Sequence, residues 1–547
     1  MPYLSTLLIS TFVTIVLIPV FSRVALRFNI GLDLPDARKV HQRPIPRIGG
    51  IAITLGVYGS AVFLAPQDQF LKAYAIASMF ILVFGLFDDL KGIDFRLKFL
   101  SQMVAALVIV IYGGLKITSL GGLLPDDMLL PDAVAIPLTV VAIVGVTNAV
   151  NLADGLDGLA GGICLLSFCC LAYLAYLEED FTLCLLALAL AGSIFGFLRY
   201  NTFPAELFMG DTGSQFLGFS AISLSLALTQ GQTPLSPLLP LVILGFPVLD
   251  TLAVMAQRFA ERRPLFSPDK NHFHHKLISL GFHHSESVLF IYVVQALFIT
   301  TAFLFRFHSE WFLLAGYVSL SAIILAGFHI AESSKWKLER THFIDSLIKG
   351  RLARMREQGL LIKICFRIVQ FGVPLLLLAT CLIPSEIPPT FVPLCAAFLG
   401  ILLIIWTFKK EWMRGWLTVI LYLFIPFIVS LSMERADVLN TFFGGIYDLA
   451  YVGIVFFVVL TLKFTRRRQG FRTTPMDFLI LFIALVVPHV LSKYLQVENL
   501  TLIAAKTVMF YFSYEVLMGE LRGKVTRLAV ASMCSLGIII ARGLLRW

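Results

Sequence analysis

Residues 148–162 read NAVNLADGLDGLAGG and lie between two long apolar runs. Asp154 and Asp157 are three residues apart, so on a helical turn both carboxylates would lie on one face. The glycines between and after them would let the backbone or a ligand come close to that face. Polar and charged side chains are costly at a membrane edge. The stretch is therefore either a helix-capping loop or part of a functional site.

The composition is that of a membrane protein. The chain has 547 residues, of which 58% are hydrophobic and 14% are charged, whereas soluble proteins carry about 25% charged residues. Apolar runs of about 18 residues or more recur from end to end. We predict an all-α polytopic membrane protein, with about eleven helices before Glu332 and about seven after Gly359. The net charge of +9 fits loop Lys and Arg that set membrane topology, so nucleic acid is not an expected partner.

The basic residues also predict which loops are cytoplasmic. The loop at 33–50 holds the basic residues Arg38, Lys39, Arg43 and Arg47, which places it inside and the N-terminus outside. Alternation of the following runs then puts every polar motif on the cytoplasmic side. The charged stretch 332–360 is the natural linker between a domain at 1–331 and a transmembrane extension at 361–547.

Three aspartates outside the first stretch also stand at the ends of predicted helices. Asp88 and Asp89 are adjacent, and such a pair repels unless a cation or a base role justifies it. Asp211, in FMGDTGSQ, lies between two glycines at a helix start, where a carboxylate suits Mg²⁺ and free amides suit phosphate. The alternatives are a solvated helix end for the pair and an ordinary cap for Asp211.

A histidine cluster follows a basic one. His272, His274 and His275 stand in DKNHFHH, after a cluster that includes Arg262. No cysteine or glutamate stands at a matching zinc spacing. We therefore predict phosphate binding or proton transfer for these side chains. Asp250 lies inside an apolar run, where a charge is a functional candidate and a buried helix contact is the alternative.

Together these residues describe a phosphoryl-transfer site on one membrane face. Such a site needs oxygen-ligated Mg²⁺ and positioned cations, and the membrane indicates a lipid phosphate as one substrate. The residues alone name neither the sugar nor the nucleotide. The rival class is a membrane lipid or glycan transporter, a flippase without transferase activity, but the sequence shows no clear internal repeat.

The motifs also resemble those of a known family. FDDLKG, NAVNLADGLDGLAGG, FMGDTGSQFLG and DKNHFHH occur in the order and roughly at the spacing seen in polyprenyl-phosphate N-acetylhexosamine-1-phosphate transferases. These enzymes belong to the glycosyl transferase family 4 superfamily, together with phospho-MurNAc-pentapeptide transferase. The resemblance covers residues 1–331, and DKNHFHH favours the hexosamine branch over the pentapeptide one, which stays the alternative. Residues 360–547 match nothing that we can place.

The resemblance implies a reaction and its setting. A cytosolic UDP-N-acetylhexosamine, in the first place UDP-GlcNAc, would give its sugar-1-phosphate to undecaprenyl phosphate. UMP would leave, and a lipid-linked cell-envelope glycan would be initiated. The implied cofactor is Mg²⁺, with Mn²⁺ as a substitute. The implied location is the bacterial inner membrane, with the site on its cytoplasmic face. A homodimer is a further expectation for the assembly.

The resemblance, with the residue chemistry above, assigns roles to individual side chains. The predicted catalytic residues are Asp88, Asp89, Asp157, His272, His274 and His275. The predicted substrate-binding residues are Asn148, Asp154, Lys98, Asp250 and Arg262. The predicted metal contacts are Asn151 and Asp211.

Overall fold

The structure is a computed structural model of the chain, and its described parts form two compact units. The described residues are 2–34, 43–64, 68–125, 128–231, 233–264, 271–334, 360–384, 386–389, 391–408, 412–433, 447, 449–458, 500–520 and 526–545. Those of the first unit lie between 2 and 334, and those of the second between 360 and 545. Within these residues, 12 helices are long and apolar enough to cross a membrane. The predicted all-α polytopic fold is confirmed.

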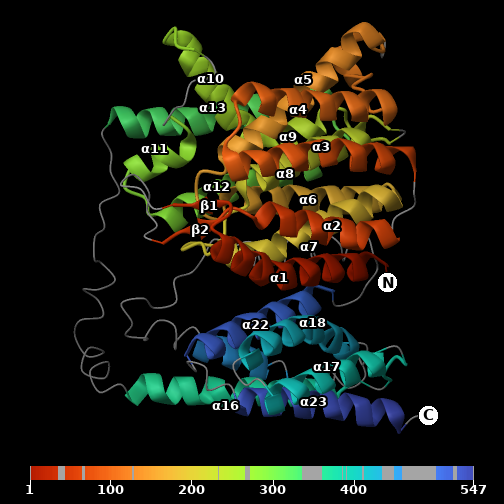
Figure 1. Cartoon of the computed structure of the whole chain (residues 1–547), viewed down its shortest axis with the longest axis vertical. Helices are drawn as coiled ribbons and strands as arrows, with labels where there is room; N and C mark the ends of the chain where they lie inside the picture. The colour runs from red at the N-terminus through yellow and green to blue at the C-terminus, as the bar shows by residue number, and fades with distance from the viewer. Residues whose placement is uncertain are drawn as a thin grey trace. The chain divides into compact units, whose positions relative to one another are not determined.

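The first unit is a bundle of helices with one small sheet (Figure 1). Its helices are α1 (Pro2–Phe28), α2 (Gly49–Leu64), α3 (Gln69–Lys91), α4 (Phe95–Leu107), η1 (Val108–Tyr112), η2 (Gly121–Leu123), α5 (Asp132–Ala153), α6 (Leu159–Leu177), α7 (Phe181–Asn201), α8 (Gly210–Thr229), α9 (Leu239–Ile243), α10 (Gly245–Ala260), α11 (Phe273–Ser279), α12 (His284–Leu304) and α13 (Glu310–Ser333). The strands β1 (Leu32–Asp33) and β2 (Ile45–Pro46) pair antiparallel. In Figure 1 the strands and α11 lie at the same end of this unit.

Helix α8 is the buried centre of the first unit. It contacts α2, α3, α5, α6, α7 and α9, and almost every residue after its first turn is buried. Small hydroxyl side chains on α8 let the neighbouring helices approach closely, and these hydroxyl groups form hydrogen bonds between helices. Ser220, for example, shares a 2.6 Å hydrogen bond with Tyr74 Oη of α3. The first turn of α8 is therefore held in place from several sides.

Inside the bundle, the helical path is interrupted between α9 and α10. The break frees backbone groups that have no water partner in this buried place. Gln295 of α12 satisfies them: its Nε2 donates to Ile243 O at 2.7 Å, and its Oε1 accepts from Phe246 N at 3.2 Å. Since Gln295 is completely buried, this polar side chain replaces the missing helical hydrogen bonds. The break sets the direction of α10, which contains Asp250.

The second unit has its own apolar core. Its helices are α16 (Leu360–Leu382), α17 (Phe391–Phe408), α18 (Met413–Met433), α22 (Leu500–Glu520) and α23 (Thr526–Leu544). Lys506 of α22 is buried against two tyrosine rings, with Nζ 4.6 Å from the ring centroid of Tyr447 and 5.1 Å from that of Tyr451. The predicted linker at 332–360 lies almost wholly outside the described residues. So does part of the extension, and its count of about seven helices stays a prediction.

Candidate active site

One end of the first unit brings together helix ends that are far apart in the sequence. The start of α8 packs closely against α2 and α3 because both neighbours place glycine there. A Cβ added to Gly50 would lie 2.4 Å from Gly213 N, and one added to Gly85 would lie 2.7 Å from Thr212 Cα. Real Cβ atoms do not come so close to backbone atoms, so larger residues would force the helices apart. The acidic end of α3 therefore lies directly against the start of α8.

Asp89 caps the start of α8 from the neighbouring helix. Its Oδ1 accepts from Asp211 N at 2.8 Å, and its Oδ2 accepts from Thr212 N at 3.0 Å and from Thr212 Oγ1 at 2.6 Å. The first amides of a helix have no partner within the helix and favour an anion. Sequence reasoning predicted a catalytic carboxylate here. The structure gives Asp89 a structural task, although the residue still lines the cavity described below.

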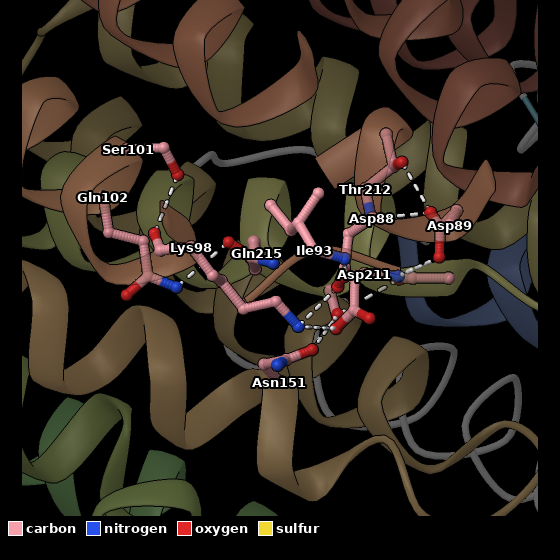
Figure 2. A network of polar contacts seen from close by, with 12 residues as sticks. Asp88, Asp89, Ile93, Lys98, Ser101, Gln102, Asn151, Asp211, Thr212 and Gln215 are labelled. Atoms are coloured by element: carbon pink, nitrogen blue, oxygen red, sulfur yellow. Dashed lines mark hydrogen bonds and ion pairs between the residues drawn. The ribbon is translucent and has the colours of Figure 1, made fainter. Parts of the chain in front are cut away.

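Asp88 points to a different partner, and Lys98 joins it to Asp211. Lys98 Nζ lies 2.6 Å from Asp88 Oδ2 and 3.1 Å from Asp211 Oδ1. Asp88 Oδ1 accepts from Ile93 N at 2.8 Å, which fixes the carboxylate at the end of α3. Figure 2 shows the lysine reaching the two carboxylates from α4. Three residues from three helices thus form one charged cluster.

A cavity of about 330 Å³ opens beside this cluster. Its walls are Asp33, Arg47, Asp89, Asn151, Asp154, Gly155, Leu156, Asp157, Asn201, Phe208, Gly210, Asp211 and Ser214. Five aspartates and one arginine face the same space, so the cavity has a strong excess of negative charge. Such a cavity concentrates cations and disfavours the ionised form of each carboxyl group.

Asp154 shows the effect of this charge. Burial raises its pKa to about 7, and the nearby carboxylates of Asp211, Asp157 and Asp89 raise it in the same direction, while Arg47 opposes them. A carboxyl group with this pKa is partly protonated at neutral pH. A bound cation would favour the ionised form of this predicted substrate-binding residue.

The two-stranded sheet supplies an ion pair that sequence reasoning missed. Arg47, just after β2, pairs with Asp33 of β1, and both residues line the cavity. Directly after this pair, Gly49 N at the start of α2 donates to Phe208 O at 2.9 Å, just before α8. The basic loop at 33–50 was noted for its charge, but only the strand pairing shows which arginine reaches the site.

The loop after α5 is held by hydrogen bonds on both sides. Asp157 Oδ2 accepts from Ala205 N at 3.0 Å, and Asp157 N donates to His284 Nε2 at 2.9 Å. Asn201 Oδ1 accepts from Gly158 N at 2.9 Å. Sequence reasoning missed His284 and Asn201. For His284 the available signal was a His pair at the start of an apolar run.

Asp250 lies behind the histidine cluster. Its Oδ2 is 2.9 Å from His272 Nδ1, and its Oδ1 accepts from Phe273 N at 2.9 Å. Both Asp250 and His272 are buried. Asp250 thus orients His272 and the start of α11, which agrees with the alternative of a buried contact. It does not line the cavity.

His274 reaches the active-site loop. A Cβ on Gly155 would lie 2.3 Å from His274 Nε2, so the imidazole packs directly on this glycine. Burial lowers the pKa of His274 to about 4, and the neighbouring imidazoles of His275 and His272 add to the effect. His274 is therefore neutral over the physiological pH range. The ring centroids of His274 and His275 lie 4.2 Å apart.

Of the predicted substrate-binding residues, Asp154 lines the cavity, whereas Lys98, Asp250, Asn148 and Arg262 do not. Asn148 lies one turn before Asn151 on α5 and is half-buried. Arg262 is exposed beyond the end of α10. The structure thus brings together Asp88, Asp89, Lys98, Asn151, Asp154, Asp157, Asp211 and His274 and leaves Asn148 and Arg262 outside. The chemical roles of all these residues stay predictions.

The donors at the cavity fit a hard cation better than zinc. Within the described residues, no group of three or more His, Cys, Asp or Glu forms a ready metal centre. Asp211 and Asn151 offer oxygen donors from α8 and α5, and Figure 2 shows Asn151 beside the Lys98–Asp211 pair. Ser214 Oγ donates to Asn151 Oδ1 at 2.6 Å and holds this amide toward the cluster. Few protein oxygens in a negatively charged cavity suit Mg²⁺, which keeps water and phosphate ligands.

The comparisons with known proteins agree with this site. Residues 71–229 match Glycosyl transferase family 4. The chain is 36% identical over 306 residues to the Bacillus subtilis "Probable undecaprenyl-phosphate N-acetylglucosaminyl 1-phosphate transferase". The matched region covers 56% of this chain and 85% of that protein. It is 32% identical over 364 residues to the Escherichia coli (strain K12) "Undecaprenyl-phosphate alpha-N-acetylglucosaminyl 1-phosphate transferase". This match covers 64% of this chain and 96% of that protein.

These similarities decide between the classes that the sequence left open. Each relative is matched over most of its own length, and the family match contains Asp88, Asp89, Lys98, Asp154 and Asp211. The prediction of an enzyme is confirmed, and the transporter without transferase activity is ruled out. Enzymes of this family are generally Mg²⁺-dependent. The chain belongs to glycosyl transferase family 4 and is a membrane-embedded phosphotransferase of the polyprenyl-phosphate N-acetylhexosamine-1-phosphate type.

Proposed function

We propose that this enzyme transfers N-acetylglucosamine-1-phosphate from UDP-GlcNAc to undecaprenyl phosphate. The printed names of the relatives supply the sugar and the lipid. In the reaction, an oxygen of the lipid phosphate forms a bond to the phosphorus that carries the sugar. The bond from that phosphorus to the UMP oxygen breaks, and UMP leaves with the electron pair. The product is a lipid-linked sugar diphosphate.

The observation that carries the proposal is the bridge of Lys98 between Asp88 and Asp211, at 2.6 and 3.1 Å. A charge-assisted hydrogen bond fixes the direction of Asp88 and stabilises its ionised form. Asp89 is occupied by the start of α8, so Asp88 is the better candidate for the carboxylate that takes a proton from the lipid phosphate. Lys98 also supplies positive charge where phosphate oxygens would gather.

Asp211 and Asn151 are the residues that we propose to hold Mg²⁺. When bound, the cation neutralises phosphate charge and stabilises the charge that develops as UMP leaves. Asp154 lines the same cavity. Its carboxyl group ionises more readily beside a cation. The five aspartates of the cavity account for the need of a cation, since diphosphate would otherwise be repelled.

The loops around the cavity provide the rest of the nucleotide site. His274 is neutral and packs on Gly155, where an imidazole N–H can donate to a diphosphate oxygen without adding a full charge. Asp157 ties its loop to Ala205 and His284, so the wall is rigid before the substrate arrives. Preorganised donors of this kind stabilise a transition state most effectively.

The orientation and the domain roles are also part of the proposal. The basic loops support a cytoplasmic position for this end of the first unit, and the cytoplasm is where nucleotide sugars are found. Residues 1–331 would perform the transfer, and 361–547 would form an additional transmembrane domain. The family match supports this division, because residues 71–229 lie within the first of these domains. The expected homodimer stays a prediction.

The direct test uses membranes that contain the full chain. Labelled UDP-GlcNAc, UDP-GalNAc and UDP-MurNAc-pentapeptide are each incubated with undecaprenyl phosphate and Mg²⁺, and lipid-linked sugar and UMP are measured. We expect product with UDP-GlcNAc and none with the pentapeptide substrate. Transfer from UDP-GalNAc alone would contradict the sugar assignment, and transfer from the pentapeptide substrate would favour the other branch.

The metal assignment is tested in the same assay with Asp211→Asn. This change keeps the size of the side chain and removes one negative charge, so the protein should remain folded while Mg²⁺-dependent transfer is lost. Turnover near that of the unaltered protein would contradict the proposed role of Asp211. Asp132→Asn is a matched control, because Asp132 pairs with Lys116 on an exposed surface outside the cavity.

A further inference from the structure

The first unit contains a second cavity of about 330 Å³, formed by α10, α11 and α13. It lies behind the histidine helix. Phe273 lines this cavity, whereas the next residue, His274, packs on Gly155 at the active-site cavity. Helix α11 is thus a wall between two separate spaces, and nothing in the transfer reaction uses the second one.

The second cavity has a polar mouth and an apolar interior. On α13, Leu325, Phe328, His329 and Glu332 line it, and their spacing puts them on one helical face. This helix is long and apolar enough to span a membrane, and Glu332 lies in its last turn. The polar residues therefore stand where the span leaves the bilayer, and Leu325 and Phe328 lie deeper. Such a gradient matches a lipid, with its headgroup at the interface and its chains below.

The charges at the mouth are of both signs. Lys276 Nζ lies 3.6 Å from Glu332 Oε1, which is longer than a direct charge-assisted hydrogen bond of about 2.7–2.9 Å. Both side chains are partly open, at 25% and 41% exposure. A phosphate beside Lys276 and an amine beside Glu332 would satisfy both groups. A doubly charged phosphate monoester would instead be repelled by Glu332.

We propose that this cavity binds the headgroup of a zwitterionic membrane phospholipid, one that carries a phosphate diester and an amine. Lys276 would contact the phosphate and Glu332 the amine. The apolar wall, which includes Val254 and Phe328, would contact the start of an acyl chain. The site is separate from the active-site cavity, because the two cavities share no lining residue.

A lipid bound here would also support the histidine helix. The rings of Phe273 and Phe328 meet edge to face, with centroids 4.7 Å apart, and Phe273 N donates to Asp250, which also holds His272. Filling the cavity would restrict Phe273 and so favour one position of α11. This consequence rests on the proposed function of the histidines, whereas lipid binding itself does not.

The test is lipid retention by the purified full-length protein. Native mass spectrometry in detergent would compare added phosphatidylethanolamine, phosphatidylglycerol and undecaprenyl phosphate, for the unaltered protein and for Lys276→Gln, Glu332→Gln and Arg263→Gln. Arg263 is the control, because it pairs with Glu261 on the surface outside the cavity. Thermal unfolding of each variant would show that it is folded.

We expect phosphatidylethanolamine to be retained in preference to the other two lipids. Each cavity variant should hold it about fivefold more weakly, the size expected for a partly exposed charge contact. The Arg263→Gln protein should retain it fully. Equal retention of all three lipids, or no effect of Lys276→Gln, would overturn the proposal. Displacement by undecaprenyl phosphate would also overturn it and would make the cavity an acceptor site. Since the readout is binding, these outcomes are independent of transferase activity.

Discussion

The backbone amide of Asp211 donates a 2.8 Å hydrogen bond to Asp89 Oδ1. The residue that we assign to the metal is thus positioned by a residue that sequence reasoning had assigned to catalysis. Because the bond joins the end of α3 to the start of α8, it makes the two acidic motifs one structural unit. It also separates the tasks of two adjacent aspartates, since Asp88 points to Lys98 instead.

This separation predicts different results for the two aspartates. Asp89→Ala removes the cap of α8 and should lower the free energy of unfolding by about 1–2 kcal/mol, with a lower unfolding temperature and reduced activity. Asp88→Asn should abolish transfer and leave the unfolding temperature nearly unchanged. The measurements are thermal unfolding in detergent and UMP release. If Asp89→Ala unfolded at the normal temperature and was inactive, Asp89 would be a catalytic group after all.

The raised pKa of Asp154 predicts that activation by Mg²⁺ depends on pH. Protons and the cation compete for this carboxyl group, whose pKa is about 7. Between pH 6 and pH 8, the Mg²⁺ concentration for half-maximal activity should therefore fall by about tenfold. The Asp154→Asn protein should lose this dependence while its residual activity still needs Mg²⁺. An unchanged pH dependence in that variant would assign the titration to another group.

The same pKa predicts the effect of pH on stability in the absence of divalent cations. A carboxyl group whose pKa is raised in the folded protein ionises first in the unfolded chain. Its contribution to stability is complete below about pH 4 and is lost progressively as the pH rises to about 7. The unfolding temperature of Asp154→Asn should vary less over this range than that of the unaltered protein. Added Mg²⁺ should reduce the difference.

The contact between Gly155 and His274 predicts a loss of function from the smallest possible substitution. Gly155→Ala would place a methyl group 2.3 Å from His274 Nε2, so the imidazole must move. We expect turnover to fall about as far as in His274→Ala, by about 10²-fold or more for a displaced catalytic donor. Gly145→Ala is the matched control, because no atom lies within 4 Å of its added Cβ. Normal turnover in Gly155→Ala would argue against a role of His274 at the diphosphate.

The hydrogen bonds of Asp250 predict a change in the proton position of His272. Asp250→Asn would keep an acceptor for Phe273 N and present an amide N–H to His272 Nδ1. His272 would then carry its proton on Nε2. We expect turnover to fall by about 10–100-fold with little change in KM for the UDP-sugar. The imidazole ¹⁵N chemical shifts of His272 would report the change directly, and unchanged shifts would contradict this positioning role.

Much of the fold could be predicted because each membrane helix can be recognised from its own stretch of sequence. Length and hydropathy identify a span without knowledge of its neighbours, and the basic loops placed the motifs at one end. The structure confirms the polytopic helical fold, and it gathers most of the motif residues around one cavity. Asp250 was recognised as unusual because it interrupts an apolar run.

The rest depends on contacts between distant segments, which residue types alone do not specify. Nothing in the sequence around Asp89 shows that its carboxylate meets the amides of α8, 122 positions later. The bond between Asp157 and His284 spans 127 positions, and the pairing of β1 with β2 decides that Arg47 is the arginine at the cavity. Arg262 was predicted from its neighbours in the sequence, but the end of α10 leaves it exposed.

Helix α8 contains Asp211 in its first turn and is enclosed by protein along almost its whole length. Its amide hydrogens should therefore be among the last in the first unit to exchange with deuterated water, since only extensive opening of the bundle exposes them. Heating should then leave catalysis intact until the bundle itself opens, so that loss of transfer and loss of helical structure follow one curve. The helix that exchanges its amide hydrogens most slowly would then be the one that carries Asp211, the proposed metal ligand.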